Sequence, residues 1–229
     1  MMITIGLLGD RNPSFITHQA IDKALELFNE RGQNVQAVWL GTKDVSFREL
    51  IGVEGLWVLP GTPYENEEIV FEALSIRREE NRPTLGTCGG FQHMVLEFAR
   101  NKVGLQTASH EETAPDGDAL VISSLQCNLV GEERLVHCVP ETRMAQICGS
   151  EPFVGFHYCN YGINPDYQTA LEVAGLRLSA FAEDAGIEAI ELDTHPFYMG
   201  TLFQPQMGLL RGLGLHPLIE RFLDVAQTA

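Results

Sequence analysis

The chain has 229 residues, of which 45% are hydrophobic and 20% charged, and its formal net charge is −16. This apolar content is enough for a sizeable core, and the length fits one large domain spanning residues 1–229. Because so acidic a surface repels phosphate backbones and anionic lipids, we expect neither a nucleic-acid partner nor a membrane partner.

The N-terminus has neither the basic start nor the long apolar segment of a signal peptide. Five cysteines in a chain of this length do not suggest a disulfide framework. Both observations predict a reduced, cytoplasmic protein. We expect no cofactor and no metal, because His137-Cys138 and His157-Tyr158-Cys159 match no standard spacing of metal ligands.

Strands and helices alternate through the first hundred residues, which indicates a parallel sheet with crossover helices. The first predicted helix ends at Gly32, a residue type that often follows a helix. The charged residues 77–81 are expected to form the solvated end of the second helix. The predicted elements are strands at 3–10, 35–42 and 52–61, helices at 14–32 and 66–83, and a strand, turn and helix at 83–104.

From about residue 117 the pattern changes to short β-like runs, which suggest hairpins flanking the same sheet. A final amphipathic segment predicts a C-terminal helix. The runs lie at 119–125, 134–139, 176–184, 187–192 and 197–203, and the helix at 216–227.

The strongest chemical signal is the turn Gly86-Thr87-Cys88-Gly89-Gly90, between a predicted strand and a predicted helix. It is the thiol version of the nucleophile elbow, in which glycines allow a sharp turn that exposes the reactive side chain. The N-terminal N–H groups of the following helix favour a thiolate at Cys88. The N–H of Gly89 is suited to one side of an oxyanion hole. The alternative is a buried cysteine in a glycine-rich turn.

Two long segments carry a resemblance to a known family. Residues 50–105, which begin LIGVEGLWVLPGTPYENEE and contain LGTCGGFQH, resemble the glutaminase domain at the C-terminal end of CTP synthase. Residues 174–207, which end in TLFQPQM, resemble the closing segment of that domain. The resemblance implies a flavodoxin-like three-layer α/β sandwich of the class I glutamine amidotransferase type, with a mostly parallel central sheet and added β-hairpins. It also implies a Cys–His–Glu site, hydrolase activity and a link with pyrimidine nucleotide biosynthesis.

The resemblance assigns roles to individual positions. It implies that Cys88 is the nucleophile and that Gly61 is an oxyanion-hole glycine, although the second glycine of the family is Thr62 here. It implies that Gln92 lines the substrate pocket and that Glu112 receives the amino group of the substrate.

The chain also departs from the family pattern. Where the family has Phe-His-Pro-Glu, this chain has Phe203-Gln204-Pro205-Gln206. A glutamine amide has no titratable proton, so Gln204 and Gln206 cannot act as a base, and we expect them to hydrogen-bond a ligand. Residues 154–164 lack the arginine that the family has there, which puts recognition of a glutamine carboxylate in doubt. Because the synthase domain is missing, we expect a standalone, divergent member.

Another residue must supply the base if Cys88 hydrolyses amides. We expect His157 to be the better substitute, because its segment borders the pocket in the family. His93, five residues after Cys88, is expected on the solvated face of its helix. Cys159 is a candidate resolving thiol for Cys88, since the same alignment places its segment near the site.

Three hypotheses for function remain open at this point. The first is an enzyme that attacks a small amino-acid-like amide through Cys88, with classical glutamine hydrolysis in doubt. The second is a non-catalytic binding or regulatory relative that retains the pocket. The third is a redox or detoxifying thiol protein. All three involve a small molecule, which is glutamine-like in the first, and a protein partner or homo-oligomer is left open.

Overall fold

The computed structural model describes residues 2–30 and 35–228 of the chain, so the predicted helix end at Gly32 lies outside the described residues. The first half alternates strand and helix as predicted. Its elements are β1 (Ile3–Leu8), α1 (Ile16–Glu30), β2 (Val35–Leu40), α2 (Phe47–Gly52), β3 (Gly55–Val58), α3 (Glu67–Glu79), β4 (Thr84–Thr87) and α4 (Gly89–Phe98). The short helix α2 was not predicted.

The main sheet has nine strands in the order β2-β1-β3-β4-β12-β11-β10-β7-β8. The pairs from β2 to β12 are parallel, and those from β12 to β8 are antiparallel. The predicted parallel sheet with added hairpins is therefore confirmed. Its second-half strands are β7 (Glu132–Cys138), β8 (Phe153–His157), β10 (Arg177–Ala182), β11 (Gly186–Glu191) and β12 (Tyr198–Thr201).

The predicted run at 119–125 does not join the main sheet. It forms β6 in a separate three-stranded sheet of β5, β6 and β9, because β6 pairs in parallel with β5 and antiparallel with β9. These strands are β5 (Ala108–His110), β6 (Ala119–Ser124) and β9 (Tyr161–Ile163). The remaining elements are the π-helix η1 (Ala99–Val103), α5 (Arg143–Cys148), α6 (Pro165–Val173), the 3₁₀ helix η2 (Pro205–Arg211) and α7 (Pro217–Ala226).

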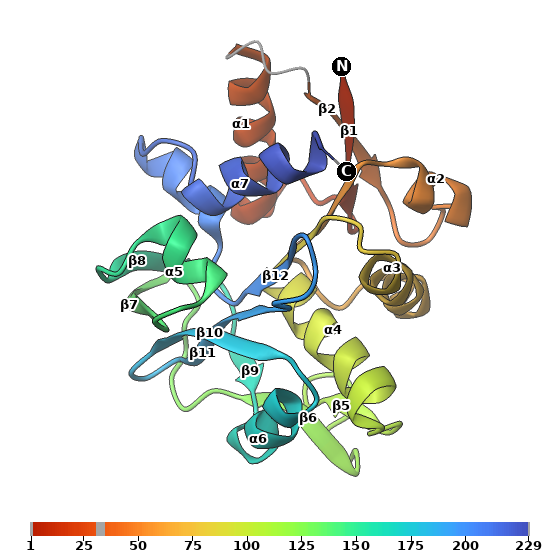
Figure 1. Cartoon of the computed structure of the whole chain (residues 1–229), viewed down its shortest axis with the longest axis vertical. Coiled ribbons are helices and arrows are strands. Elements are labelled where there is room, and N and C mark those ends of the chain that lie inside the picture. The colour runs from red at the N-terminus through yellow and green to blue at the C-terminus, as the bar shows by residue number, and fades with distance from the viewer. Residues whose placement is uncertain (1, 31–34, 229) are drawn as a thin grey trace.

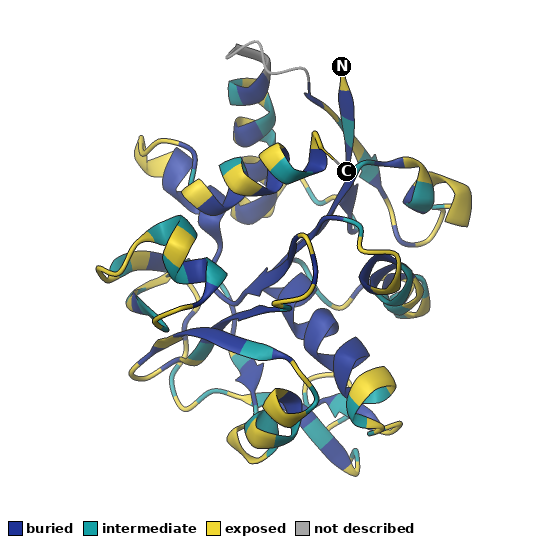
Figure 2. Ribbon diagram, viewed as in Figure 1, coloured by how far each residue is buried: buried dark blue, intermediate teal, exposed yellow. Residues whose placement is uncertain are grey.

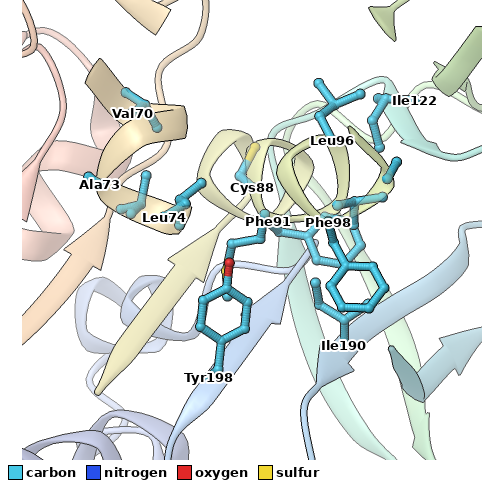
Figure 3. Packing of buried hydrophobic residues seen from close by; sticks show 14 of the residues in the cluster. Val70, Ala73, Leu74, Cys88, Phe91, Leu96, Phe98, Ile122, Ile190 and Tyr198 are labelled. Atoms are coloured by element: carbon cyan, nitrogen blue, oxygen red, sulfur yellow. The ribbon is translucent and has the colours of Figure 1, made fainter. Parts of the chain in front are cut away.

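Helices cover both faces of the main sheet, which gives the predicted three layers (Figure 1). Successive strand residues point to opposite faces, so Leu56 and Val58 of β3 pack in one core while Trp57 packs in the other. The first core contains side chains of α3 and α4, together with Ile122 of the small sheet (Figure 3). The second core contains the apolar faces of α1 and α7.

The helix α4 is buried along its whole length (Figure 2). Its first turn can pack this closely on the sheet only because the contact positions are glycines. A Cβ atom on Gly90 would lie 2.2 Å from the carbonyl oxygen of Val58, and one on Gly86 would lie 2.4 Å from the sulfur of Met94. The glycines therefore fix where Cys88, at the start of this helix, lies relative to the sheet.

The prediction that the charged end of α3 is solvated is wrong for its two arginines. Arg77 is 1% exposed and Arg78 is 8% exposed. Arg77 donates hydrogen bonds to the carbonyl oxygens of Val53, Glu54 and Pro83 at 2.7–3.0 Å. Arg78 forms a bidentate pair with Glu97. Buried guanidinium groups need such partners, and a charge run in a sequence does not reveal them.

No helix within residues 2–30 and 35–228 is both long enough and apolar enough to cross a bilayer.

We predict that Gly90→Ala destabilises the fold by about 1–3 kcal/mol, because the added methyl group meets the backbone of β3 rather than a movable side chain. Urea denaturation would measure the change in the free energy of unfolding. Gly41→Ala is the matched control, since a Cβ atom there meets nothing within 4 Å. Equal stability of the two variants would contradict this account of the packing.

Candidate active site

Cys88 lies in the strained turn that the sequence predicted. Its backbone has φ 52° and ψ −106°, a conformation that is rare for a residue with a side chain. The N–H of Cys88 donates to the carbonyl oxygen of Thr201 at 2.8 Å, which ties the turn to β12. The N–H of Gly89 hydrogen-bonds the sulfur and partly opposes the larger effects that raise the pKa of the Cys88 thiol. The turn thus presents the sulfur at the N-terminus of α4.

A cavity of about 440 Å³ lies over Cys88. Four of the other predicted site residues also line it: Gly61, Gln92, Glu112 and Gln204. The wall otherwise consists of residues from four parts of the chain, including the first turn of α1 and the start of β9. They are Ser14, Phe15, Ile16, Thr17, Pro60, Thr62, Val130, Tyr158, Cys159, Asn160 and Tyr161.

Cys159 lines the same cavity as Cys88, and the two thiols lie close enough for each to shift the pKa of the other. The sulfur of Cys159 also accepts from the side-chain amide of Gln92 at 3.0 Å and from the N–H of Tyr161 at 3.4 Å. The same Gln92 amide donates to the carbonyl oxygen of Tyr161 at 2.8 Å. The segment around Cys159 is therefore bound to α4 through Gln92.

The pKa values of the two thiols are shifted in opposite directions. The hydrogen bond with Cys88 is the largest cause that lowers the pKa of Cys159, and the Gln92 amide adds to it. The same hydrogen bond, followed by burial, raises the pKa of Cys88 well above its ordinary value.

Gln204 and Gln206 are fully buried, and the amide of Gln206 donates to the side-chain oxygen of Gln204 at 2.9 Å. Gln204 faces the cavity, whereas the structure does not bring Gln206 to the wall. The Nε2 of Gln204 has no partner in the structure, and neither does the Oε1 of Gln206. An unpaired buried donor on a cavity wall is costly unless a ligand or water satisfies it.

Glu112 lies at the exposed rim of the cavity. Its backbone N–H donates to Nδ1 of His110 at 3.1 Å, and His110 is buried at the end of β5 against the ring of Tyr161. Burial lowers the pKa of His110 to about 4. His110 therefore stays neutral near pH 7, as acceptance through Nδ1 requires.

Comparison with known proteins agrees with this arrangement. The family model described as "Glutamine amidotransferase class-I" matches residues 17–209. The chain belongs to this family. It is 31% identical to the CTP synthase of Sulfolobus acidocaldarius, over 83% of this chain and 39% of that protein. It is 34% identical to the CTP synthase of Thermococcus kodakarensis, over 75% of this chain and 35% of that protein. The chain thus spans less than half the length of these relatives.

Solved structures support the same fold. The glutaminase domain of the Trypanosoma brucei CTP synthase, with bound acivicin, matches with a TM-score of 0.86 at 21% identity, covering 99% of this chain and 94% of that one. A glutamine amidotransferase from Thermotoga maritima matches with a TM-score of 0.63 at 13% identity, covering 100% of this chain and 84% of that one. The predicted class I glutamine amidotransferase fold is confirmed.

His157, predicted as the substitute base, does not line the cavity of this amidotransferase-like site. It is fully buried on β8, and its Nε2 lies 2.9 Å from both carboxylate oxygens of the fully buried Glu188 on β11. Its Nδ1 has no partner in the structure. Within the part of the chain that the structure describes, no hydrogen bond joins His157 to Cys88.

His93 is not on a solvated face, as expected from the sequence, but is 2% exposed. Its Nδ1 lies 2.9 Å from the carbonyl oxygen of Gly89, and its ring packs against Tyr64 and Phe71. The error has a physical cause, because α3 and Tyr64 pack over the side of α4 that the sequence pattern left open to solvent.

Sequence reasoning missed the contacts made by Gln92 and Cys159, and it missed the aromatic wall. Phe15 and Tyr158 lie in loops and Tyr161 begins β9, and their spacing in the sequence carries no signal for a shared cavity. It also missed a second pair of hydrogen-bonded thiols, Cys138 on β7 and Cys148 at the end of α5.

We predict that Glu188→Gln lowers the free energy of unfolding by about 2 kcal/mol, because it removes the carboxylate that faces His157 in a fully buried pair. Urea denaturation measures this loss. Glu183→Gln, an exposed change in the loop that precedes β11, is the control and should be nearly neutral. A stable Glu188→Gln variant whose Cys88 alkylates more slowly would instead support His157 as the base.

Proposed function

We propose that this chain is a CTP synthase glutaminase-like thiol hydrolase in which Cys88 attacks the carbonyl carbon of a small amino-acid-like amide. One observation carries the proposal: Cys88 occupies a strained elbow at the N-terminus of α4, on the wall of a cavity of about 440 Å³. A structural cysteine needs neither the strain nor the cavity, whereas a nucleophile needs both.

Hydrogen-bond donors around the sulfur suit the oxyanion that such an attack creates. The N–H of Gly89 already points toward the sulfur of Cys88. Gln204, whose Nε2 has no partner in the structure, and Gly61 line the same cavity. Fixed donors in a buried site stabilise developing negative charge more strongly than water does.

Cys159 is the residue best suited to replace the missing imidazole. In the proposed sequence, the Cys159 thiolate accepts the proton of Cys88 as the sulfur of Cys88 bonds to the substrate carbon. When the C–N bond breaks, the Cys159 thiol returns that proton to the amine, which leaves a thioester on Cys88. Water then hydrolyses the thioester. The position of Cys159 on the same cavity wall as Cys88 supports this role.

The glutamine pair explains why catalysis would be slow. Gln204 faces the cavity and Gln206 hydrogen-bonds it from behind, the arrangement that a histidine and its orienting carboxylate need. The two glutamines keep the geometry of a histidine and its carboxylate, but they cannot transfer a proton.

We predict that Gln204→His combined with Gln206→Glu raises kcat/KM for amide hydrolysis by about 10²–10⁴-fold, because an oriented imidazole then transfers the proton. Ammonia release from glutamine and other small primary amides measures the rate. Cys159→Ser should slow the natural chain and have little effect in the doubly substituted one.

Cys88→Ala is the control and should abolish hydrolysis in both backgrounds. Activity that survives Cys88→Ala would contradict the proposal. A folded double variant that hydrolyses no faster than the natural chain would also contradict it, and would favour a non-catalytic binding protein.

A redox function is the second candidate, and the contact between Cys88 and Cys159 favours it. With a peroxide as oxidant, one thiolate takes an oxygen atom from the peroxide to become a sulfenic acid. The other thiol then displaces water and forms a disulfide.

For this candidate we predict a disulfide between Cys88 and Cys159 after peroxide treatment, reversible by dithiothreitol and found by peptide mass mapping. The pair Cys138 and Cys148 is an internal comparison, since its thiols are also hydrogen-bonded but lie outside the cavity. Oxidation of that second pair alone would remove the redox candidate.

A further inference from the structure

The charge on the side chains of the cavity wall is of one sign, which is negative. Glu112 is its only carboxylate, and among the described residues no lysine, arginine or histidine lines the cavity. The whole chain carries a net charge of −16, so the surrounding field also favours cations. A ligand carboxylate entering this cavity would lose water without gaining a cationic side chain, which is unfavourable.

The uncharged part of the wall suits the rest of a small organic cation. Phe15, Tyr158 and Tyr161 provide aromatic surface, which attracts alkyl groups and ammonium ions. Gln204 also lines the cavity, and its buried Nε2 has no hydrogen-bond partner in the structure. The wall therefore offers one anionic group, one amide side chain with an unpaired donor and an aromatic lining.

We propose that the cavity selects a small organic ammonium compound that carries an amide and lacks a carboxylate, with its ammonium group at Glu112 and its carbonyl oxygen at Gln204. This inference names the substrate class of the site and rests on the proposed function for the chemistry at Cys88. Free glutamine carries a carboxylate as well as an ammonium group, so under this inference it is not the preferred substrate.

A cation at Glu112 also acts on the thiol pair. The negative charge of Glu112 raises the pKa of both Cys88 and Cys159. A bound ammonium group offsets that charge and so makes the thiolate of the pair easier to form. The substrate itself thus supplies part of the activation that the missing histidine would give.

Binding of three matched amides to the Cys88→Ser variant tests the inference without any catalysis. Glutamine, 4-aminobutanamide and butanamide differ only in their carboxylate and ammonium groups, and isothermal titration calorimetry measures the affinities. We expect 4-aminobutanamide to bind about tenfold more tightly than glutamine, because the carboxylate finds no partner. We expect it to bind about fivefold more tightly than butanamide, because Glu112 is an exposed ion-pair partner.

Glu112→Gln should remove the advantage of 4-aminobutanamide over butanamide. Glu111→Gln is the matched control and should keep it, because the Glu111 side chain accepts from the N–H of Ser124 and does not line the cavity. Glutamine that binds as tightly as 4-aminobutanamide would overturn the inference, as would an ammonium advantage that survives Glu112→Gln.

The two proposals fail separately. If the binding preferences hold but the natural chain forms no thioester at Cys88 with either amide, the hydrolase proposal fails and the ligand class stands. If a thioester forms but glutamine is the tighter ligand, the hydrolase proposal stands and the ligand class fails. Intact mass spectrometry of the natural chain gives the thioester readout.

Discussion

The close approach of α4 to the parallel strands is the constraint on which the site depends. Gly86 and Gly90 leave no side chain between the helix and the sheet, so the chain must reverse within one residue. That residue is Cys88, and its positive φ is the consequence. The burial of α4 along its whole length holds the strained turn in place, because no part of the helix can move outward without exposing apolar side chains. Strain at Cys88 is therefore supported by packing over the whole helix rather than by local hydrogen bonds alone.

The same packing explains how the site tolerates the loss of the histidine and glutamate pair of the family pattern. Gln204 and Gln206 are fully buried beside β12 and still form one hydrogen bond with each other. Each keeps one unpaired polar atom, which costs stability in a buried position. A protein that had lost all use for the cavity would gain stability from apolar residues at these positions. Retention of two partly satisfied amides thus favours a cavity that still binds a polar ligand.

Local patterns predicted the strands and helices of the first half, the glycine-rich turn at Cys88 and the final helix. His93 of α4 shows the limit of such patterns, since it was expected on a solvated face but is buried against Tyr64 and Phe71, which a pattern within one helix does not reveal. The pairing of His157 with Glu188 has the same origin, because it depends on a partner that no sequence spacing identifies. The resemblance to the CTP synthase glutaminase domain identified several residues of the cavity and placed the segment of Cys159 near it. The hydrogen bonds of Cys159 depend on side-chain positions, which an alignment does not supply.

Electrostatics connects the thiol pair to the rest of the molecule. In a site with a histidine, the imidazole accepts the proton and its positive charge stabilises the thiolate. Here the proposed substitute, Cys159, is itself an anion once it has lost its proton, so a thiolate of the pair would place a negative charge in a buried site. The amides of Gln92 and Gly89 stabilise that charge, while Glu112 and the acidic chain oppose it. The positive charge of the proposed ammonium ligand at Glu112 would offset that opposition and favour the thiolate of the pair.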